Sequence, residues 1–161
     1  MFKEMFIIEL FDTPSKVKKA HSDSDFDAWT TIINDKKYVI VMNKIPLNDK
    51  KIGYNIAFKF KDENGKSVYK SDIKLDNSEI LSLFSTILEV LKNYDNISYL
   101  EFEPNEDRKV KLYNTFAKKL KSYFKLDNVQ IASKDQKIKI YKGETPPKYK
   151  KKFLNKLAEK I

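Results

Sequence analysis

Apolar and polar residues alternate along much of the first 75 positions, which is the pattern of strands that bury one face. The predicted strands lie at residues 2–10, 28–33, 38–42, 54–60 and 67–75. Asn34-Asp35-Lys36-Lys37 and Asn64-Gly65 separate neighbouring strands, and such residues favour hairpin turns because they tolerate positive φ. Residues 14–25 are polar and show no period, so we predict a loop there, or at most a short helix.

The hydrophobic period changes to that of a helix after residue 75. Apolar side chains recur at three- and four-residue steps from Ile80 to Tyr94, and they form one apolar stripe. Asp76 and Glu79 have the spacing of a capping box, which predicts that this helix begins at Asp76. Further along, the pattern predicts a strand at 97–102, a helix opening at 104–107, and a closing hairpin at 129–132 and 137–141.

The order of these elements, β(β)4-α-β-α-ββ, predicts an α+β fold, a layered α/β arrangement with two core helices on a mostly antiparallel sheet. A length of 161 residues favours one domain, which we place at residues 1–145. Pro146-Pro147 cannot extend a strand ladder. Residues 146–161 are therefore predicted to form a basic amphipathic tail that contains a short helix.

The composition excludes several classes of chemistry. The chain has no Cys, which excludes disulfides and thiol nucleophiles, and His21 is its single histidine. His21 lies among aspartates in a polar loop, which favours a surface position over a divalent-cation site, so no metal is expected. The three glycines form no phosphate-binding signature. No apolar run is long enough to span a bilayer, and two acids within residues 1–10 argue against a signal peptide.

Charge is distributed unevenly along the chain, whose formal net charge is +9. Residues 1–107 hold 15 basic and 19 acidic side chains, whereas residues 108–161 hold 17 basic and 4 acidic ones. This segregation predicts a positive surface that attracts an acidic macromolecule, either a protein or a nucleic acid. A solvated lysine-rich surface without a partner is the alternative. The candidate anion-binding residues are Arg108, Lys109, Lys111, Lys118, Lys148, Lys150, Lys151 and Lys152.

The element order and one short motif carry a family resemblance. Residues 106–113, Glu-Asp-Arg-Lys-Val-Lys-Leu-Tyr, resemble the stretch Asn-x-x-Ala-x-x-Leu-Tyr that opens the last core helix of GNAT N-acetyltransferases. The chain is also similar to small phage-encoded GNAT-like proteins. The topological likeness covers residues 26–141. The sequence departs from the family motif at Glu106, at Lys109, and at Ala117-Lys118, where the family has Asn, Ala and Gly-Phe.

The resemblance implies specific roles near the two helices. Tyr113 would be the general acid that protonates a leaving thiolate, although its spacing with Val110 and Phe116 favours a core aromatic. The family binds the acetyl-CoA pyrophosphate on a glycine-rich loop, and the corresponding residues 73–79 contain neither Gly nor Arg. Lys74 alone offers a compensating charge there. We therefore expect no cofactor, and acetyl-CoA only if the protein is an enzyme.

Two further side-chain groups are assigned from the pattern. Glu101 and Glu103 alternate on the predicted strand 97–102 and its end, so they are expected to face solvent, and a role as catalytic bases is the alternative. Trp29 and Phe26 are expected to fill the core. Aromatic residues interleave with the basic ones of the C-terminal third and are candidates for stacking on bases: Tyr113, Tyr123, Phe124, Tyr141, Tyr149 and Phe153.

These observations favour a non-catalytic GNAT-like interaction or structural module, of the kind that phages encode, that docks on an acidic partner through its basic C-terminal third. The alternative is an acyl-CoA-dependent N-acetyltransferase with an atypical cofactor loop. A third hypothesis is a protein that binds nucleic acid directly. Specific recognition of bases is not expected, because Arg108 is the single arginine of the chain. The expected location is the cytoplasm, of the host cell for a phage protein, or the virion.

Overall fold

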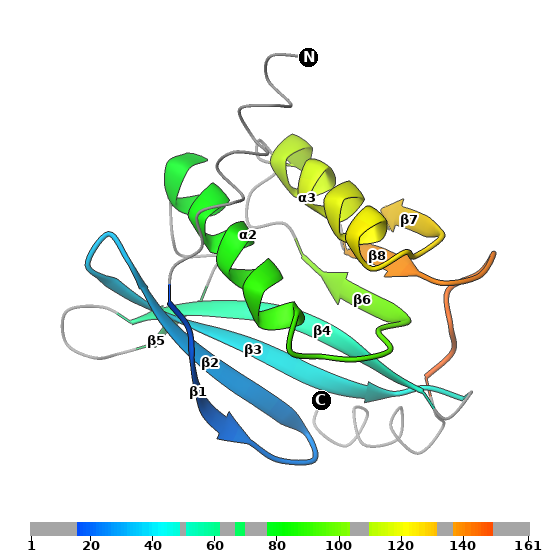
Figure 1. The fold of residues 1–161 in the computed structure, drawn as a ribbon, viewed down its shortest axis with the longest axis horizontal. Helices are drawn as coiled ribbons and strands as arrows, with labels where there is room; N and C mark the ends of the chain where they lie inside the picture. The colour runs from blue at the N-terminus through cyan, green and yellow to red at the C-terminus, as the bar shows by residue number, and fades with distance from the viewer. Residues whose placement is uncertain are drawn as a thin grey trace. The chain divides into compact units, whose positions relative to one another are not determined.

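The computed structural model describes residues 16–48, 51–61, 67–69, 77–103, 110–131 and 137–149. Within these ranges the chain forms eight strands and two helices, which confirms the α+β class and the mostly antiparallel sheet (Figure 1). In chain order the elements are β1 (Lys18–Ser22), β2 (Phe26–Ile33), β3 (Lys36–Pro46), β4 (Ile52–Lys61), β5 (Ser67–Tyr69), α2 (Asn77–Leu91), β6 (Tyr99–Phe102), α3 (Val110–Tyr123), β7 (Asn128–Ile131) and β8 (Ile138–Tyr141). The predicted strand 2–10 and the Asn64-Gly65 turn lie outside the described residues.

The strands follow the order β1-β2-β3-β4-β6-β8-β7, and β5 pairs with β4 beside this path. β4 and β6 run parallel, whereas the pairs β1–β2, β4–β5, β6–β8 and β7–β8 are antiparallel. The chain divides into two compact units. Unit 1 comprises residues 1–23, 27–41 and 58–95, and unit 2 comprises 24–26, 42–57 and 96–161. β3 and β4 contribute residues to both units.

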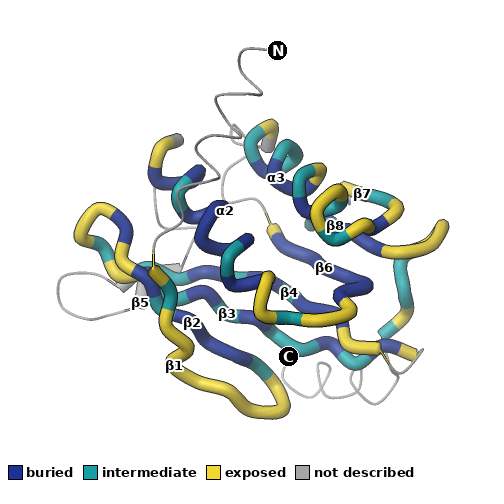
Figure 2. Tube along the Cα trace, viewed as in Figure 1, coloured by how far each residue is buried: buried dark blue, intermediate teal, exposed yellow. Residues whose placement is uncertain are grey.

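β1 corrects the prediction of a loop or short helix at residues 14–25. Residues 18–22 form a strand that pairs with β2 from Lys18↔Thr30 to Ser22↔Asp27, with a register shift between Lys19 and His21. Every residue of β1 is exposed (Figure 2). A strand without a buried face has no hydrophobic alternation, so its sequence carried no period to detect. Backbone pairing to β2 defines it instead.

The turn and the helix predicted in unit 1 are confirmed. Asn34 and Asp35 have φ values of 51° and 61°, as a two-residue hairpin turn between twisted strands requires. α2 begins at Asn77 among the described residues, and the predicted cap Asp76 lies outside them. The apolar stripe of α2 is buried as predicted, with its least exposed members at Ile80, Leu83, Phe84, Ile87, Val90 and Leu91.

Two buried carboxylates of unit 1 are held by hydrogen bonds. Glu79 accepts from Lys36 Nζ at 3.1 and 3.2 Å and from the Tyr38 hydroxyl at 3.0 Å. Asp27 accepts from the Tyr94 hydroxyl at 2.6 Å, and that same hydroxyl accepts from Trp29 Nε1 at 3.0 Å. Trp29 is buried, as predicted. Because buried polar groups cost free energy unless they are bonded, these contacts tie the start of α2 and the segment after it to the strands.

Unit 2 is built around β6, which is buried along its whole length (Figure 2). β6 pairs with β4 at Tyr54↔Leu100 and Asn55↔Glu101, and with β8 from Tyr99↔Tyr141 to Phe102↔Ile138. α3 buries Tyr113, Phe116, Ala117 and Leu120, and Phe102 contacts two of these rings, Tyr113 at 6.1 Å and Phe116 at 5.9 Å between centroids.

The end of α3 requires a left-handed residue. Lys125 has a φ of 55°, the Leu126 N–H donates to the Lys121 carbonyl at 2.8 Å, and the Lys125 N–H donates to Ser122 at 3.3 Å. This is the Schellman arrangement, in which glycine is the usual residue at the position of Lys125. A lysine there carries a steric penalty that glycine avoids.

Lys125→Gly is therefore expected to raise the free energy of unfolding by about 1 kcal/mol, measured by urea denaturation. Lys118→Gly is the control, because it removes the same charge from an exposed position inside α3 and should lower stability by about 1 kcal/mol. A loss of stability in Lys125→Gly would contradict the assigned helix end.

Candidate functional site

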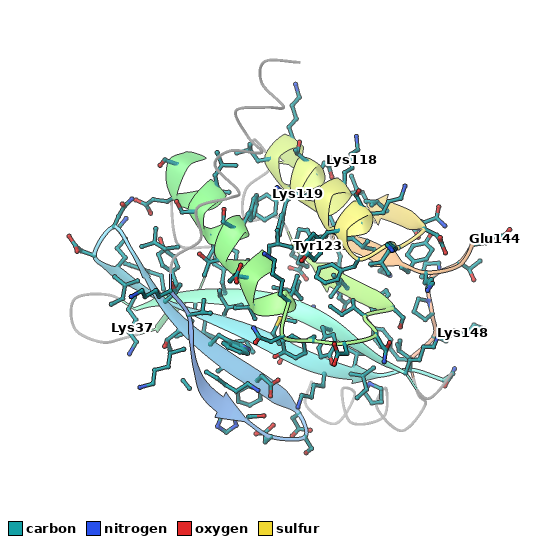
Figure 3. All side chains as sticks on the ribbon, viewed as in Figure 1. Lys37, Lys118, Lys119, Tyr123, Glu144 and Lys148 are labelled. Atoms are coloured by element: carbon teal, nitrogen blue, oxygen red, sulfur yellow. The ribbon has the colours of Figure 1, made fainter. Side chains whose placement is uncertain are left out.

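The predicted anion-binding residues are partly described. Lys111 and Lys118 are exposed on α3, and Lys148 is exposed on the segment after β8. Figure 3 shows Lys118 and Lys148 on these separate elements of unit 2. Both elements therefore present lysines, but at different places on the unit. The remaining anion-binding candidates, Arg108, Lys109, Lys150, Lys151 and Lys152, lie outside the described residues, as does the cofactor-loop candidate Lys74.

α3 is a strongly basic helix of unit 2. Its sequence, VKLYNTFAKKLKSY, contains four lysines and no acid. Lys111, Lys118, Lys119 and Lys121 are exposed or half-buried, and we call these four residues the α3 lysine face. With no carboxylate in the helix to offset them, the four ammonium groups produce a positive potential along its solvent side. This face is suited to an anionic surface.

Tyr123 lies at the border of the α3 lysine face. It follows Lys119 by four residues, so the two side chains lie on the same side of the helix (Figure 3). Tyr123 is 49% exposed, one of the few large hydrophobic residues so exposed in the described chain. Phe124 contacts the Tyr123 ring edge-to-face, with centroids 4.9 Å apart. A large ring is therefore presented beside lysines, rather than being buried with the core aromatics.

Glu101 corrects the expectation that the acids of this strand face solvent. Glu103 is exposed, but Glu101 is only 3% exposed. The reason is topological, because β6 lies between β4 and β8 and all four of its residues are buried. Strand alternation places every second residue on the opposite face, but it cannot show that both faces of a strand are covered.

The Glu101 carboxylate is surrounded by donors from four segments. The Tyr99 hydroxyl donates to it at 2.8 Å and the Tyr149 hydroxyl lies 2.7 Å from both of its oxygens. Asn55 Nδ2 donates at 3.3 Å, and Lys137 Nζ lies 3.7 Å away. We call these five residues the Glu101 cluster. With both oxygens engaged, the carboxylate joins β4, β6, the residue before β8 and the C-terminal segment.

This environment keeps Tyr99 protonated. Burial raises the pKa of the Tyr99 hydroxyl far above its ordinary value, and the Glu101 charge raises it further. Tyr99 therefore remains a hydrogen-bond donor at any physiological pH. A general base must have an acceptor site directed at the substrate proton, whereas Glu101 directs its oxygens at Tyr99, Tyr149 and Asn55. This arrangement favours a structural role for Glu101 over a role as catalytic base.

The segment after β8 is attached to unit 2 through its backbone and one ring. The Asn48 N–H donates to the Lys148 carbonyl at 3.0 Å, and Leu47 and Tyr149 form an isolated antiparallel bridge. The Tyr149 ring contacts the Tyr99 ring edge-to-face at 6.3 Å between centroids. The start of the predicted tail is thus tied to the domain past Pro146-Pro147, and the position of Lys148 is fixed by these contacts.

Gly53 lets the Tyr99 ring approach the backbone of β4. A Cβ atom at position 53 would lie 2.7 Å from Tyr99 Cδ1 and 3.1 Å from Tyr99 Cβ. Real Cβ atoms do not tolerate such a distance, and the ring is held by Glu101 and Tyr149. Glycine at this strand position is therefore required by close approach rather than by backbone conformation. The sequence alone did not indicate this role for Gly53.

Two other candidate residues have defined surroundings. Tyr113 is 1% exposed and packs against Phe102, as the core interpretation expects, and its role as a general acid stays a prediction. His21 Nε2 lies 2.6 Å from Asp23 Oδ2, and both side chains are well exposed. Across the described ranges, no group of three or more potential metal ligands is present.

Comparison with known proteins does not assign the chain to a family. No family model matches it, and no curated protein matches it significantly. Among the residues that the structure describes, no helix is both long and apolar enough to cross a bilayer. The geometry of the site therefore carries the functional argument.

Proposed function

We propose that the protein is a non-catalytic, GNAT-like interaction module that binds an acidic macromolecule through its basic C-terminal third. The observation that carries the proposal is the α3 lysine face, in which four lysines on one helix have no acid among them. Lys148 adds a positive charge on an anchored segment. Lysines on an ordered backbone lose less backbone freedom on binding than lysines on an unstructured segment would.

Two further observations support the separate parts of this proposal. The chain order of antiparallel strands, then α2, β6, α3, β7 and β8, supports the GNAT-like part. The Glu101 cluster supports the non-catalytic part, because its carboxylate is buried and engaged by donors of the protein itself. Acetyl-CoA is not part of the proposal, since Lys74 and most of the loop 73–79 lie outside the described residues.

Binding to fluorescently labelled heparin tests the proposal in the full chain. The affinity should fall steeply with salt, because each neutralised anionic group releases counterions. The double variant Lys118→Gln with Lys121→Gln should bind about tenfold more weakly at low salt and show a shallower salt slope, measured by fluorescence anisotropy.

The matched control is Lys18→Gln with Lys37→Gln, which removes two exposed lysines from strands β1 and β3. Its net charge equals that of the α3 variant, so an effect of global charge would weaken both variants equally. Equal weakening, or no heparin binding by the unmodified protein, would reject the α3 lysine face as the binding surface.

A further inference from the structure

We propose that the acidic partner is single-stranded nucleic acid, and that a base stacks on the Tyr123 ring at the border of the α3 lysine face. The inference rests on the proposed function and specifies its partner. It starts from the juxtaposition of a 49% exposed tyrosine with Lys119 one helical turn before it and Lys118 next to that (Figure 3).

The exposed ring is the feature that an acidic protein partner would not need. Carboxylates are attracted by lysines alone, whereas bases add a π-face that stacks on aromatic side chains. Phe124 contacts the Tyr123 ring at 4.9 Å and 71°, and this contact restrains the ring at the surface. A restrained ring loses little conformational entropy when a base stacks on it.

The same surface favours single strands over duplexes. In a duplex the faces of the bases are covered by their neighbours in the stack, so Tyr123 would have no face to contact. Lysines bind phosphates as point charges and do not provide the bidentate contacts of arginine. The four residues of the α3 lysine face are all lysine. We therefore expect binding that tolerates many base sequences and depends strongly on salt.

The test compares a labelled oligothymidine of about 15 nucleotides with an abasic strand of the same length. The two strands carry the same phosphates, so any difference in affinity comes from the bases. The unmodified protein should bind oligothymidine about tenfold more tightly than the abasic strand. Tyr123→Ala should lose that difference, and Tyr123→Phe should keep it, because the stacking ring is retained.

The outcomes separate this inference from the proposed function. If heparin binding depends on Lys118 and Lys121 while oligothymidine and the abasic strand bind equally, the proposed function stands and the nucleic-acid inference is overturned. If Tyr123→Ala weakens binding to both strands equally, Tyr123 supports the lysine face structurally and stacking is overturned. Equal affinity for a duplex of the same length would overturn the preference for single strands.

Discussion

Replacing Glu101 with alanine is expected to lower the free energy of unfolding by about 3–5 kcal/mol. The carboxylate accepts hydrogen bonds from the hydroxyls of Tyr99 and Tyr149 and from the Asn55 amide. Alanine would leave the buried Tyr99 hydroxyl without this acceptor, and an unsatisfied buried donor costs about 1–3 kcal/mol. Urea denaturation followed by circular dichroism measures the change.

Glu103→Ala provides the matched control, because Glu103 is the same residue type two positions along the chain and is exposed. It should change stability by less than about 0.5 kcal/mol. Glu101→Gln should fall between the two variants, because glutamine keeps one oxygen acceptor but brings an amide toward the Tyr99 hydroxyl. Equal effects of Glu101→Ala and Glu103→Ala would show that the Glu101 cluster does not hold unit 2 together.

Most elements that sequence analysis predicted correctly have a periodic apolar pattern, although β6 is buried along its whole length. α3 buries residues at three- and four-residue steps, and β2 to β4 bury alternate ones along part of their length. The apolar residues of α2 recur at helical steps, although nearly all of its residues from Glu79 on are buried. Hydrophobic burial is the main source of stability in such elements, so their pattern is visible in the sequence. β1 has no buried residue. It depends on backbone pairing with β2, which any polar sequence can provide, and no pattern in residues 18–22 distinguishes it from a loop.

The candidate site likewise has one part that the sequence could predict and one that it could not. Lysines at helical spacing with no intervening acid can be counted in the sequence, so the positive surface of α3 was predictable from it. The burial of Glu101 was not, because it depends on where β4 and β8 pair with β6. The donors Asn55, Lys137 and Tyr149 are 46, 36 and 48 positions from Glu101 in sequence. No local spacing rule connects residues so far apart in the chain.

Gly53→Ala is expected to destabilise the protein by about 1–3 kcal/mol, although alanine is ordinarily the better residue in a strand. The added Cβ would lie 2.7 Å from Tyr99 Cδ1. The ring cannot move away freely, because its hydroxyl donates to Glu101 and the ring contacts that of Tyr149. Either β4 separates from β6 or Tyr99 leaves the Glu101 cluster, and both responses lose buried contacts. Urea denaturation of the variant measures the cost.

A double-mutant cycle with Tyr99→Ala shows whether the clash is the cause. Removing the ring also removes the nearest contact of the new Cβ, so Gly53→Ala should cost at least about 1 kcal/mol less in the Tyr99→Ala background. Gly143→Ala is the control, since its φ of 95° is strained for alanine but no atom lies within 4 Å of the added Cβ. Its cost should be the same in both backgrounds, because its strain is in its own backbone. Additive effects of Gly53→Ala and Tyr99→Ala would contradict the close approach of β4 to the Tyr99 ring.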